Sequence, residues 1–453
     1  MEPSLPENAM ERSPRNHLWR YGAIVLFAVL ISLSCQAIPR PDRTTAGLDS
    51  RVLQDSLRVT ETVARPLLRQ LLPADIALPD NTVSARSTIN GSVNTWFAVE
   101  VVQLLTRLSR TLPAVSGHAW PSDVQITAAL ADGDGQIRVI YSNAAEAYFA
   151  PARIPLASTA KIFVGIGLGE HDTAQMRYCV PKRITSWITA DAERSSSCPL
   201  GNRSVGAGMA FARSMPGPLL WRARQVLTDH ELKRIFVRLG IVPDGYASLR
   251  EAAILGQVTA SPREMHRAVH AVTLALTGHD AAARMPSVID VIETRNTANG
   301  GLDRIPVPMP ALAPETYRSV LTARAVNYLR QVLSAPIHAG TLRALSSLKL
   351  PELGIAFLWG KTGTHATRGE TRTMWIVGGL DVRDRPYSWL VLIKAGDDRH
   401  TFGNINAAAF APVAKLLIEA AVRDRATDVS PATAGPTEAD PPARWWSAGS
   451  RDN

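Results

Sequence analysis

The sequence predicts an α/β (α+β) fold whose sheet is assembled from the two ends of one long segment. At the first end, residues 124–130 are apolar and β-prone, an Asp-Gly-Asp-Gly run at 132–135 can form a turn, and residues 136–141 alternate between apolar and polar. This succession is typical of a β-hairpin. The second end carries three further strand-like segments, at residues 354–358, 373–380 and 387–395.

Helices fill the middle of this segment and close it. Residues 206–300 have mostly helical patterns, clearest at 229–239 and 262–276, and residues 407–422 form an Ala-rich amphipathic stretch. Strands at both ends with helices between them predict a mixed sheet with a helical subdomain.

Composition and charge limit the classes of function. The chain has 453 residues, of which 46% are hydrophobic and 20% are charged, enough for two or three domains or one large domain with an appendage. A net charge of +9 suits an anionic surface such as a membrane or cell wall, although a generally Arg-rich composition explains it equally well. No basic run or aromatic-basic interleaving indicates a nucleic-acid partner. No constellation of metal-ligating side chains is apparent in the sequence, so we expect no metal and no cofactor.

The N-terminus predicts a membrane anchor. Residues 1–20 are polar and contain three arginines, and residues 21–38 are almost wholly apolar, just long enough to span a bilayer. The arginines predict a cytoplasmic N-terminus, a single pass through the inner (cytoplasmic) membrane and a periplasmic or extracellular remainder. A cleaved signal peptide is the alternative, and Cys35 also leaves a lipoprotein open.

The rest of the chain divides into three parts. Residues 39–121, with helical patterns at 48–72 and 96–112, are interpreted as a pedestal or linker. Residues 122–425 hold the α+β domain. Residues 426–453 are rich in Pro, Ala and Thr, so we expect a disordered tail.

The two remaining cysteines are Cys179 and Cys198, which flank a polar stretch without helical periodicity. If the chain is exported, they lie in an oxidising compartment and can pair. We predict a disulfide between them; two free thiols are the alternative.

Ser158 and Lys161 are the first candidate catalytic residues. They are three residues apart, so on a helix they share one face. A serine hydroxyl becomes a good nucleophile when a base takes its proton, and a lysine can be that base if burial lowers its pKa. The apolar run at residues 162–166 supplies such a setting.

A Lys-Thr-Gly-Thr sequence at Lys361, Thr362, Gly363 and Thr364 strengthens this interpretation. Ser-x-x-Lys followed at a distance by Lys-Thr-Gly is a known pair of catalytic motifs. A second Ser-x-x-Lys begins at Ser346, but it lies too close to Lys361 to leave room for a helical subdomain between them.

On these motifs, residues from about 124 to 425 resemble the transpeptidase domain of penicillin-binding proteins, within the superfamily of serine D,D-peptidases and serine β-lactamases. Further similar stretches lie at residues 210–214, 255–265 and 411–413. No glutamate-bearing glycosyltransferase motif is present, and residues 39–123 are too few for that domain.

The resemblance implies a role for each motif residue. Ser158 would be the acylated nucleophile, Lys161 its base, and Ser214 a proton carrier between Lys161 and the leaving amine. Lys361 would hold the substrate carboxylate, while Thr362 and Thr364 would hydrogen-bond the substrate on a strand that pairs with its backbone. Gly363 would leave room for that approach. The backbone N–H groups of Ser158 and Thr364 would form the oxyanion hole.

One departure concerns the second motif. The family has Ser-x-Asn, and the matching residues here are Ser214, Met215 and Pro216, so the side-chain amide is absent. We therefore expect this departure to affect turnover more than the fold.

The resemblance implies a membrane-anchored D,D-transpeptidase that cross-links peptidoglycan stem peptides, is inhibited by β-lactams and works beside cell-wall synthesis proteins. A D,D-carboxypeptidase, a β-lactamase and a non-catalytic penicillin-binding-like scaffold or sensor are the alternatives.

Overall fold

The computed structural model describes much of the chain from residue 78 to residue 428, with gaps. The described residues are 56–58, 78–116, 124–143, 148–180, 193–194, 198, 203–279, 286–296, 298–307, 321–367, 369–395 and 401–428. The predicted anchor at 21–38 and residues 429–453 of the predicted tail lie outside them. Within the described ranges, no helix is both long enough and apolar enough to span a bilayer.

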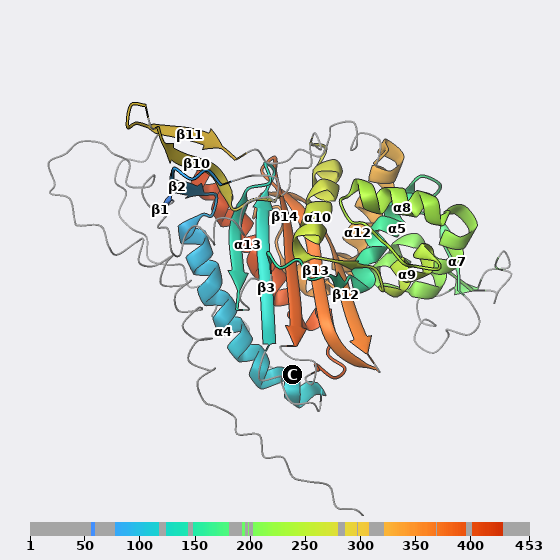
Figure 1. The fold of residues 1–453 in the computed structure, drawn as a ribbon. Helices are drawn as coiled ribbons and strands as arrows, with labels where there is room; N and C mark the ends of the chain where they lie inside the picture. The colour runs from blue at the N-terminus through green and yellow to red at the C-terminus, as the bar shows by residue number, and fades with distance from the viewer. Residues whose placement is uncertain are drawn as a thin grey trace, which may run out of the picture.

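A five-stranded sheet forms the centre of the molecule (Figure 1). Its strand order is β12-β13-β14-β3-β4, and all four pairings are antiparallel. The strands are β3 (Val124–Asp132), β4 (Ile137–Ser142), β12 (Ile355–Thr367), β13 (Glu370–Val382) and β14 (Arg385–Ala395). The predicted hairpin and the three C-terminal strands are therefore present, and the pairing of β14 with β3 joins the two ends of the segment as expected. The sheet differs from the predicted mixed sheet in being antiparallel at each of these pairings.

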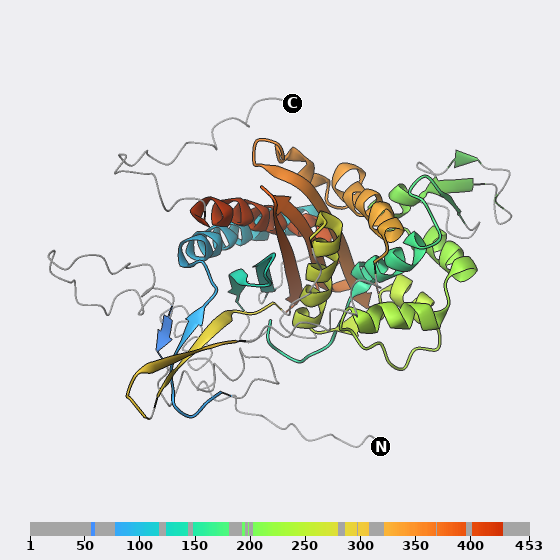
Figure 2. The same cartoon turned by 90° about the horizontal axis from the view of Figure 1, so that it is seen from above.

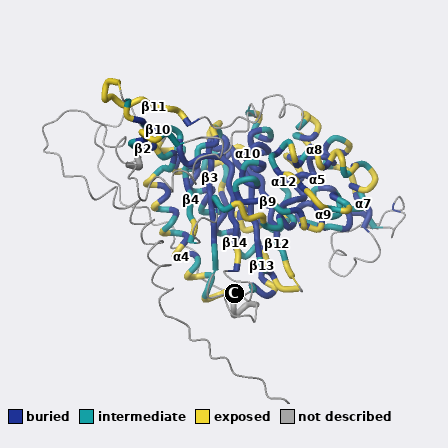
Figure 3. The backbone as a smooth tube through the Cα atoms, in the orientation of Figure 1, coloured by how far each residue is buried: buried dark blue, intermediate teal, exposed yellow. Residues whose placement is uncertain are grey.

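Helices cover both faces of this sheet (Figure 2). On one face, α13 (Ala411–Asp428) packs against the strands, and α4 (Gly91–Ser116) packs against α13. On the other face, α10 (Pro262–Thr277) crosses β13 and β14. The central strands are consequently buried on both sides (Figure 3).

The position of α4 corrects the predicted domain boundary. The helix was expected from its apolar stripe, but residues 39–121 were interpreted as a separate pedestal. Instead, Val93, Phe97 and Val101 are buried in the same apolar core as the sheet and α13. An amphipathic pattern shows that a helix has a buried face without showing which surface covers it. Residues 91–116 therefore belong to the body of the domain.

A second, four-stranded sheet also includes part of the predicted pedestal. Its order is β1-β2-β10-β11, with β1 (Ser56–Arg58), β2 (Thr82–Ser87), β10 (Ile289–Arg295) and β11 (Leu302–Pro306). Two expectations are wrong here: residues 56–58 form a strand inside the stretch 48–72 that was predicted to be helical, and residues 289–295 form a strand at the end of the helical region. Both segments are short, so their own periodicity is a weak signal; both pair with β2, and β10 also pairs with the nearby β11.

The helical subdomain lies beside the β12 edge of the central sheet (Figure 1). Its helices are α5 (Lys161–Gly169), α6 (Ala207–Ala212), α7 (Pro216–Val226), α8 (Asp229–Arg238), α9 (Leu249–Leu255) and α12 (Ala323–Ala339). Two small sheets complete it, β5 (Ile154–Pro155) with β9 (Thr259–Ala260), and β6 (Arg177–Cys179), β8 (Arg203–Gly206) and β7 (Glu193–Arg194). The α+β class and the helical subdomain are confirmed.

Candidate active site

Ser158 and Lys161 lie where the sequence placed them, at the start of a buried helix. Ser158 belongs to the 3-10 turn η1 (Ala157–Ala160), which runs directly into α5. All nine residues of α5 are buried, so the Lys161 side chain is surrounded by protein, whereas Ser158 is only partly buried. The Nζ atom of Lys161 lies 2.5 Å from the Oγ atom of Ser158, within hydrogen-bonding distance.

Ser214 lies on the other side of Lys161. It follows α6 in a tight turn, with a φ of 56°. Its Oγ atom lies 3.4 Å from Nζ of Lys161 and 2.8 Å from Nζ of Lys361. Lys361 comes from β12 and also donates to the carbonyl oxygen of Thr362 at 2.9 Å. Four groups from three separate segments of the sequence thus form one chain of hydrogen-bonding distances, from Ser158 through Lys161 and Ser214 to Lys361.

Burial makes both lysines unusually acidic. Lys161 is 2% exposed and Lys361 is fully buried. Burial lowers the pKa of Lys161 to about 7. Burial, and then the charge of Lys161, hold the pKa of Lys361 well below its usual value. No described carboxylate forms an ion pair with either lysine. A lysine that is neutral for much of the time near pH 7 can accept a proton from a serine hydroxyl.

Gly363 is required where β12 packs against η1, the turn that carries Ser158. A methyl group built on Gly363 would lie 2.8 Å from the carbonyl oxygen of Leu156 and 3.1 Å from the Cβ atom of Ala157. The sequence suggested a different reason, that a side chain would obstruct the substrate. In this structure, β12 packs directly against η1, and the missing side chain allows that contact.

Thr362 and Thr364 each hydrogen-bond another part of the protein. Thr362 donates its hydroxyl to Oγ1 of Thr341 at 2.7 Å, and Oγ1 of Thr364 accepts from the backbone N–H of Ala407 at 3.1 Å. The Thr364 hydroxyl proton stays available for a further acceptor. Thr341 was not among the residues predicted from the sequence; it follows α12 and donates its own N–H to the carbonyl of Ala212 at 3.3 Å. No local pattern marks this residue, because its role depends on contacts with two distant segments.

Ala157 has a backbone conformation that favours glycine. Its φ is 50°, directly before the nucleophile candidate Ser158. A non-glycine residue in this region costs about 1–3 kcal/mol and persists only where its surroundings hold it. Such strain concentrates at functional sites, and no local pattern in the sequence predicts it.

Pro216 begins α7, with Met215 as the residue before the helix. Proline suits the first position of a helix because its missing N–H would have no partner there. The residue that replaces the expected asparagine therefore has a local structural role.

The second Ser-x-x-Lys does not form a comparable site. Ser346 is exposed and donates its hydroxyl to the carbonyl of Arg343 at 2.7 Å. Lys349 is exposed as well and pairs with Glu352 at 3.1 Å. Neither group is positioned to activate the other.

A disulfide joins Cys179 and Cys198 in the structure, with their Cα atoms 5.4 Å apart. Cys179 ends β6, which pairs with β8 just before α6, the helix that leads to Ser214. The bridge therefore braces the segment that precedes the second motif.

Comparison with known proteins supports the fold. No family model matches the sequence, and no curated protein matches it. Among solved structures, the penicillin-binding protein PonA1 from Mycobacterium tuberculosis matches with a TM-score of 0.51 and 16% identity, over 79% of this chain and 90% of that one. The D,D-transpeptidase domain of the peptidoglycan glycosyltransferase from Eggerthella lenta matches with a TM-score of 0.48 and 14% identity, over 76% of this chain and 84% of that one. The chain has the fold of the transpeptidase domain of penicillin-binding proteins.

Proposed function

We propose that the protein is a membrane-anchored, penicillin-binding D,D-transpeptidase that cross-links peptidoglycan through an acyl-enzyme on Ser158. The observation that carries this proposal is the 2.5 Å contact between Ser158 and a buried lysine whose pKa is about 7. The apolar run at residues 21–38 supports the anchor, with the catalytic domain outside the cytoplasm. We further propose peptidoglycan stem peptides as substrates, β-lactams as inhibitors and cell-wall synthesis proteins as partners.

Acylation begins with proton transfer. Lys161 takes the hydroxyl proton of Ser158 while Oγ attacks the carbonyl carbon of the D-Ala-D-Ala peptide bond. The negative charge on the substrate oxygen is stabilised by the N–H groups of Ser158 and Thr364. The C–N bond then breaks, and the leaving amine of D-Ala takes the proton from Lys161 by way of Ser214. The acceptor amine of a second stem peptide attacks the ester, loses a proton and restores the Ser158 hydroxyl.

Lys361 contributes through charge. It is buried beside another amine, so its protonated form is disfavoured in the free protein. The substrate carboxylate supplies the missing negative charge, and its arrival raises the pKa of Lys361. Because β12 is the edge strand of the central sheet, an extended substrate can pair with its free side.

Labelled penicillin tests this proposal. The wild-type protein should be labelled on Ser158, Ser158→Ala should not be labelled, and Ser346→Ala should be labelled at the wild-type rate. Labelling that survives Ser158→Ala would show that another residue is acylated. An unlabelled wild-type protein would favour the non-catalytic scaffold, which the absence of the family's asparagine at Pro216 supports. Muropeptide analysis then separates a transpeptidase, which forms cross-links, from a carboxypeptidase, which uses water and forms trimmed stem peptides.

A further inference from the structure

The segment that leads into Ser158 lies along a second segment from the helical subdomain. β5 pairs with β9, so that Ile154 and Pro155 oppose Ala260 and Thr259. The pairing continues toward the nucleophile candidate: Leu156 donates its N–H to the carbonyl of Val258 at 2.7 Å. Ala157 donates its N–H to the carbonyl of Gly256 at 3.0 Å. The backbone is therefore held residue by residue up to the peptide bond before Ser158.

Gly256 packs directly against this peptide bond. It follows α9 and has a φ of 78°, a conformation that glycine adopts easily. A methyl group built on it would lie 2.5 Å from the carbonyl carbon and 2.8 Å from the carbonyl oxygen of Ala157. These atoms belong to the peptide group that carries the Ser158 N–H. No side chain fits between α9 and this peptide group without moving one of them.

Gly363, on β12, packs against the same segment. Its missing side chain leaves room for the carbonyl of Leu156 and the Cβ of Ala157, as described above. Ala157 thus contacts both the end of α9, through its backbone, and strand β12, through its Cβ atom. Two neighbouring contacts fix the same segment: Trp375 donates its indole N–H to the carbonyl of Pro155 at 2.8 Å, and Thr159 donates its hydroxyl to the carbonyl of Leu156 at 2.5 Å.

We propose that Gly256 is a positioning residue for the acylation of Ser158, and that it acts through Ala157. The contacts with Gly256 and with Gly363 together hold Ala157 at a φ of 50°. That conformation sets the direction of the Ser158 N–H and the position of Ser158 Oγ beside Lys161. The role rests on the proposed function, since acylation is the step that it serves.

The test compares two glycines with the same backbone conformation. Gly256 and Gly278 each follow a helix, α9 and α10, with φ values of 78° and 79°. A methyl group on Gly278 would meet nothing within 4 Å. Gly278→Ala therefore has the same backbone strain as Gly256→Ala, without the clash with Ala157.

Second-order rate constants for acylation by a labelled penicillin should fall about 100-fold in Gly256→Ala, because a misplacement near 1 Å has effects of that order. They should stay within about twofold of wild type in Gly278→Ala. The labelled fraction at the end point should stay complete in both variants. A smaller labelled fraction with an unchanged rate constant would mean that Gly256 serves folding alone, and an unchanged rate constant with full labelling would likewise overturn the proposal.

Hydrogen exchange on the wild-type protein gives a second test that needs neither a variant nor activity. The amides of Leu156 and Ala157 should exchange as slowly as those of β14, because both are held by hydrogen bonds between packed segments. Exchange as fast as in the exposed strand β11 would overturn the proposal. If the wild-type protein is not labelled by penicillin, the proposed function fails, and the exchange result alone decides whether Gly256 holds the segment.

Discussion

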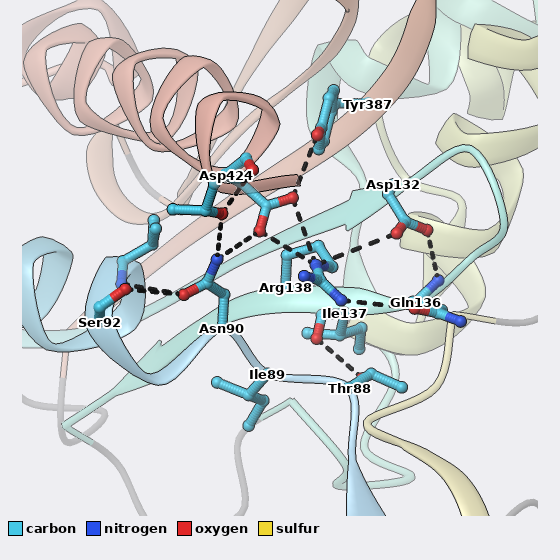
Figure 4. Close-up of polar contacts among 12 residues, drawn as sticks. Thr88, Ile89, Asn90, Ser92, Asp132, Gln136, Ile137, Arg138, Tyr387 and Asp424 are labelled. Atoms are coloured by element: carbon cyan, nitrogen blue, oxygen red, sulfur yellow. Dashed lines mark hydrogen bonds and ion pairs between the residues drawn. The ribbon is translucent and has the colours of Figure 1, made fainter. Parts of the chain in front are cut away.

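Buried charge is handled differently at the two edges of the central sheet. Beside β12, Lys161 and Lys361 are buried without an acidic partner among the described residues, and each pKa is lowered. Near β4, Arg138 pairs with Asp424 at 3.0 Å (Figure 4). Asp424 also accepts from Asn90 at 2.9 Å and from Tyr387 at 3.1 Å.

The second cluster joins segments that are distant in the sequence. Asn90 precedes α4, Arg138 lies on β4 and Asp424 on α13, so their contacts tie the N-terminal helix and the C-terminal helix to the sheet. Asp132, at the end of β3, pairs with Arg385 at 2.7 Å. Burial nevertheless raises the pKa of Asp132, and the nearby arginines offset this only in part.

This difference indicates that the cluster around Asp424 contributes to stability, whereas Lys161 and Lys361 contribute to chemistry. A buried charge with a partner holds segments together, whereas a buried amine without one destabilises the fold when it is protonated, so its neutral form is favoured. Shifted pKa values of this kind mark functional sites. Substitutions should therefore affect the two clusters in opposite ways.

The largest effect is expected for Lys161→Met. Loss of the base should slow acylation by about 10²–10⁴-fold. The same change should raise the free energy of unfolding at pH 7 by a few kcal/mol, because it removes a buried amine. Lys349→Met is the control, since Lys349 is exposed, and it should change neither quantity. The comparison would be contradicted if Lys161→Met were acylated at the wild-type rate, or if it were less stable than the wild-type protein.

Asp424→Ala should have the opposite outcome. It leaves Arg138 buried without its partner, and breaking a buried pair costs about 3–5 kcal/mol. The rate constant for acylation of the folded protein should stay unchanged. Urea unfolding at pH 7 measures the loss, and Glu352→Ala, which breaks an exposed pair, should cost at most about 1 kcal/mol. A lower rate constant for acylation in folded Asp424→Ala would mean that the two clusters are coupled.

These clusters also differ in how far the sequence predicted them. Ser158, Lys161 and Lys361 were found because the first two share a helical face and the third lies in a strand with a recognisable motif. Nothing local connects Asn90 or Asp424 with Arg138, because single polar residues far apart in the chain have no periodic pattern. The strands and helices of the central sheet were predicted from their own periodicity.

What the sequence could not supply was the packing of one segment on another. The strained φ of Ala157 results from its contacts with α9 and β12, and the hydroxyl partner of Thr362 comes from the end of α12. The position of α4 in the core of the domain was not predicted for the same reason.

A smaller effect is expected for Pro216→Asn. The family's asparagine would hydrogen-bond the substrate, and a lost buried hydrogen bond of that kind costs about 1–3 kcal/mol. Restoring it should speed acylation by a labelled penicillin about 5- to 150-fold. Since Pro216 occupies the first position of α7, asparagine should leave the protein folded. Second-order rates must be compared, because a slow enzyme also reaches full labelling. An unchanged or lower rate in a folded variant would show that another group has this role.

The smallest effect is the pH dependence of the wild-type protein. With a pKa of about 7, Lys161 is mostly protonated at pH 6 and mostly neutral at pH 8, so the acylation rate should rise about tenfold over that range and then level off.

The stability of the folded protein should change in the same direction. The folded pKa of Lys161 lies below its unfolded value of 10.5, so between these values the unfolded chain binds more protons, and the free energy of unfolding rises with pH. The rise in the free energy of unfolding with pH that Lys161 causes should be absent in Lys161→Met and retained in Lys349→Met. A wild-type rate that falls between pH 6 and pH 8 would show that the protonated amine, and not the free base, is the form that acylation requires.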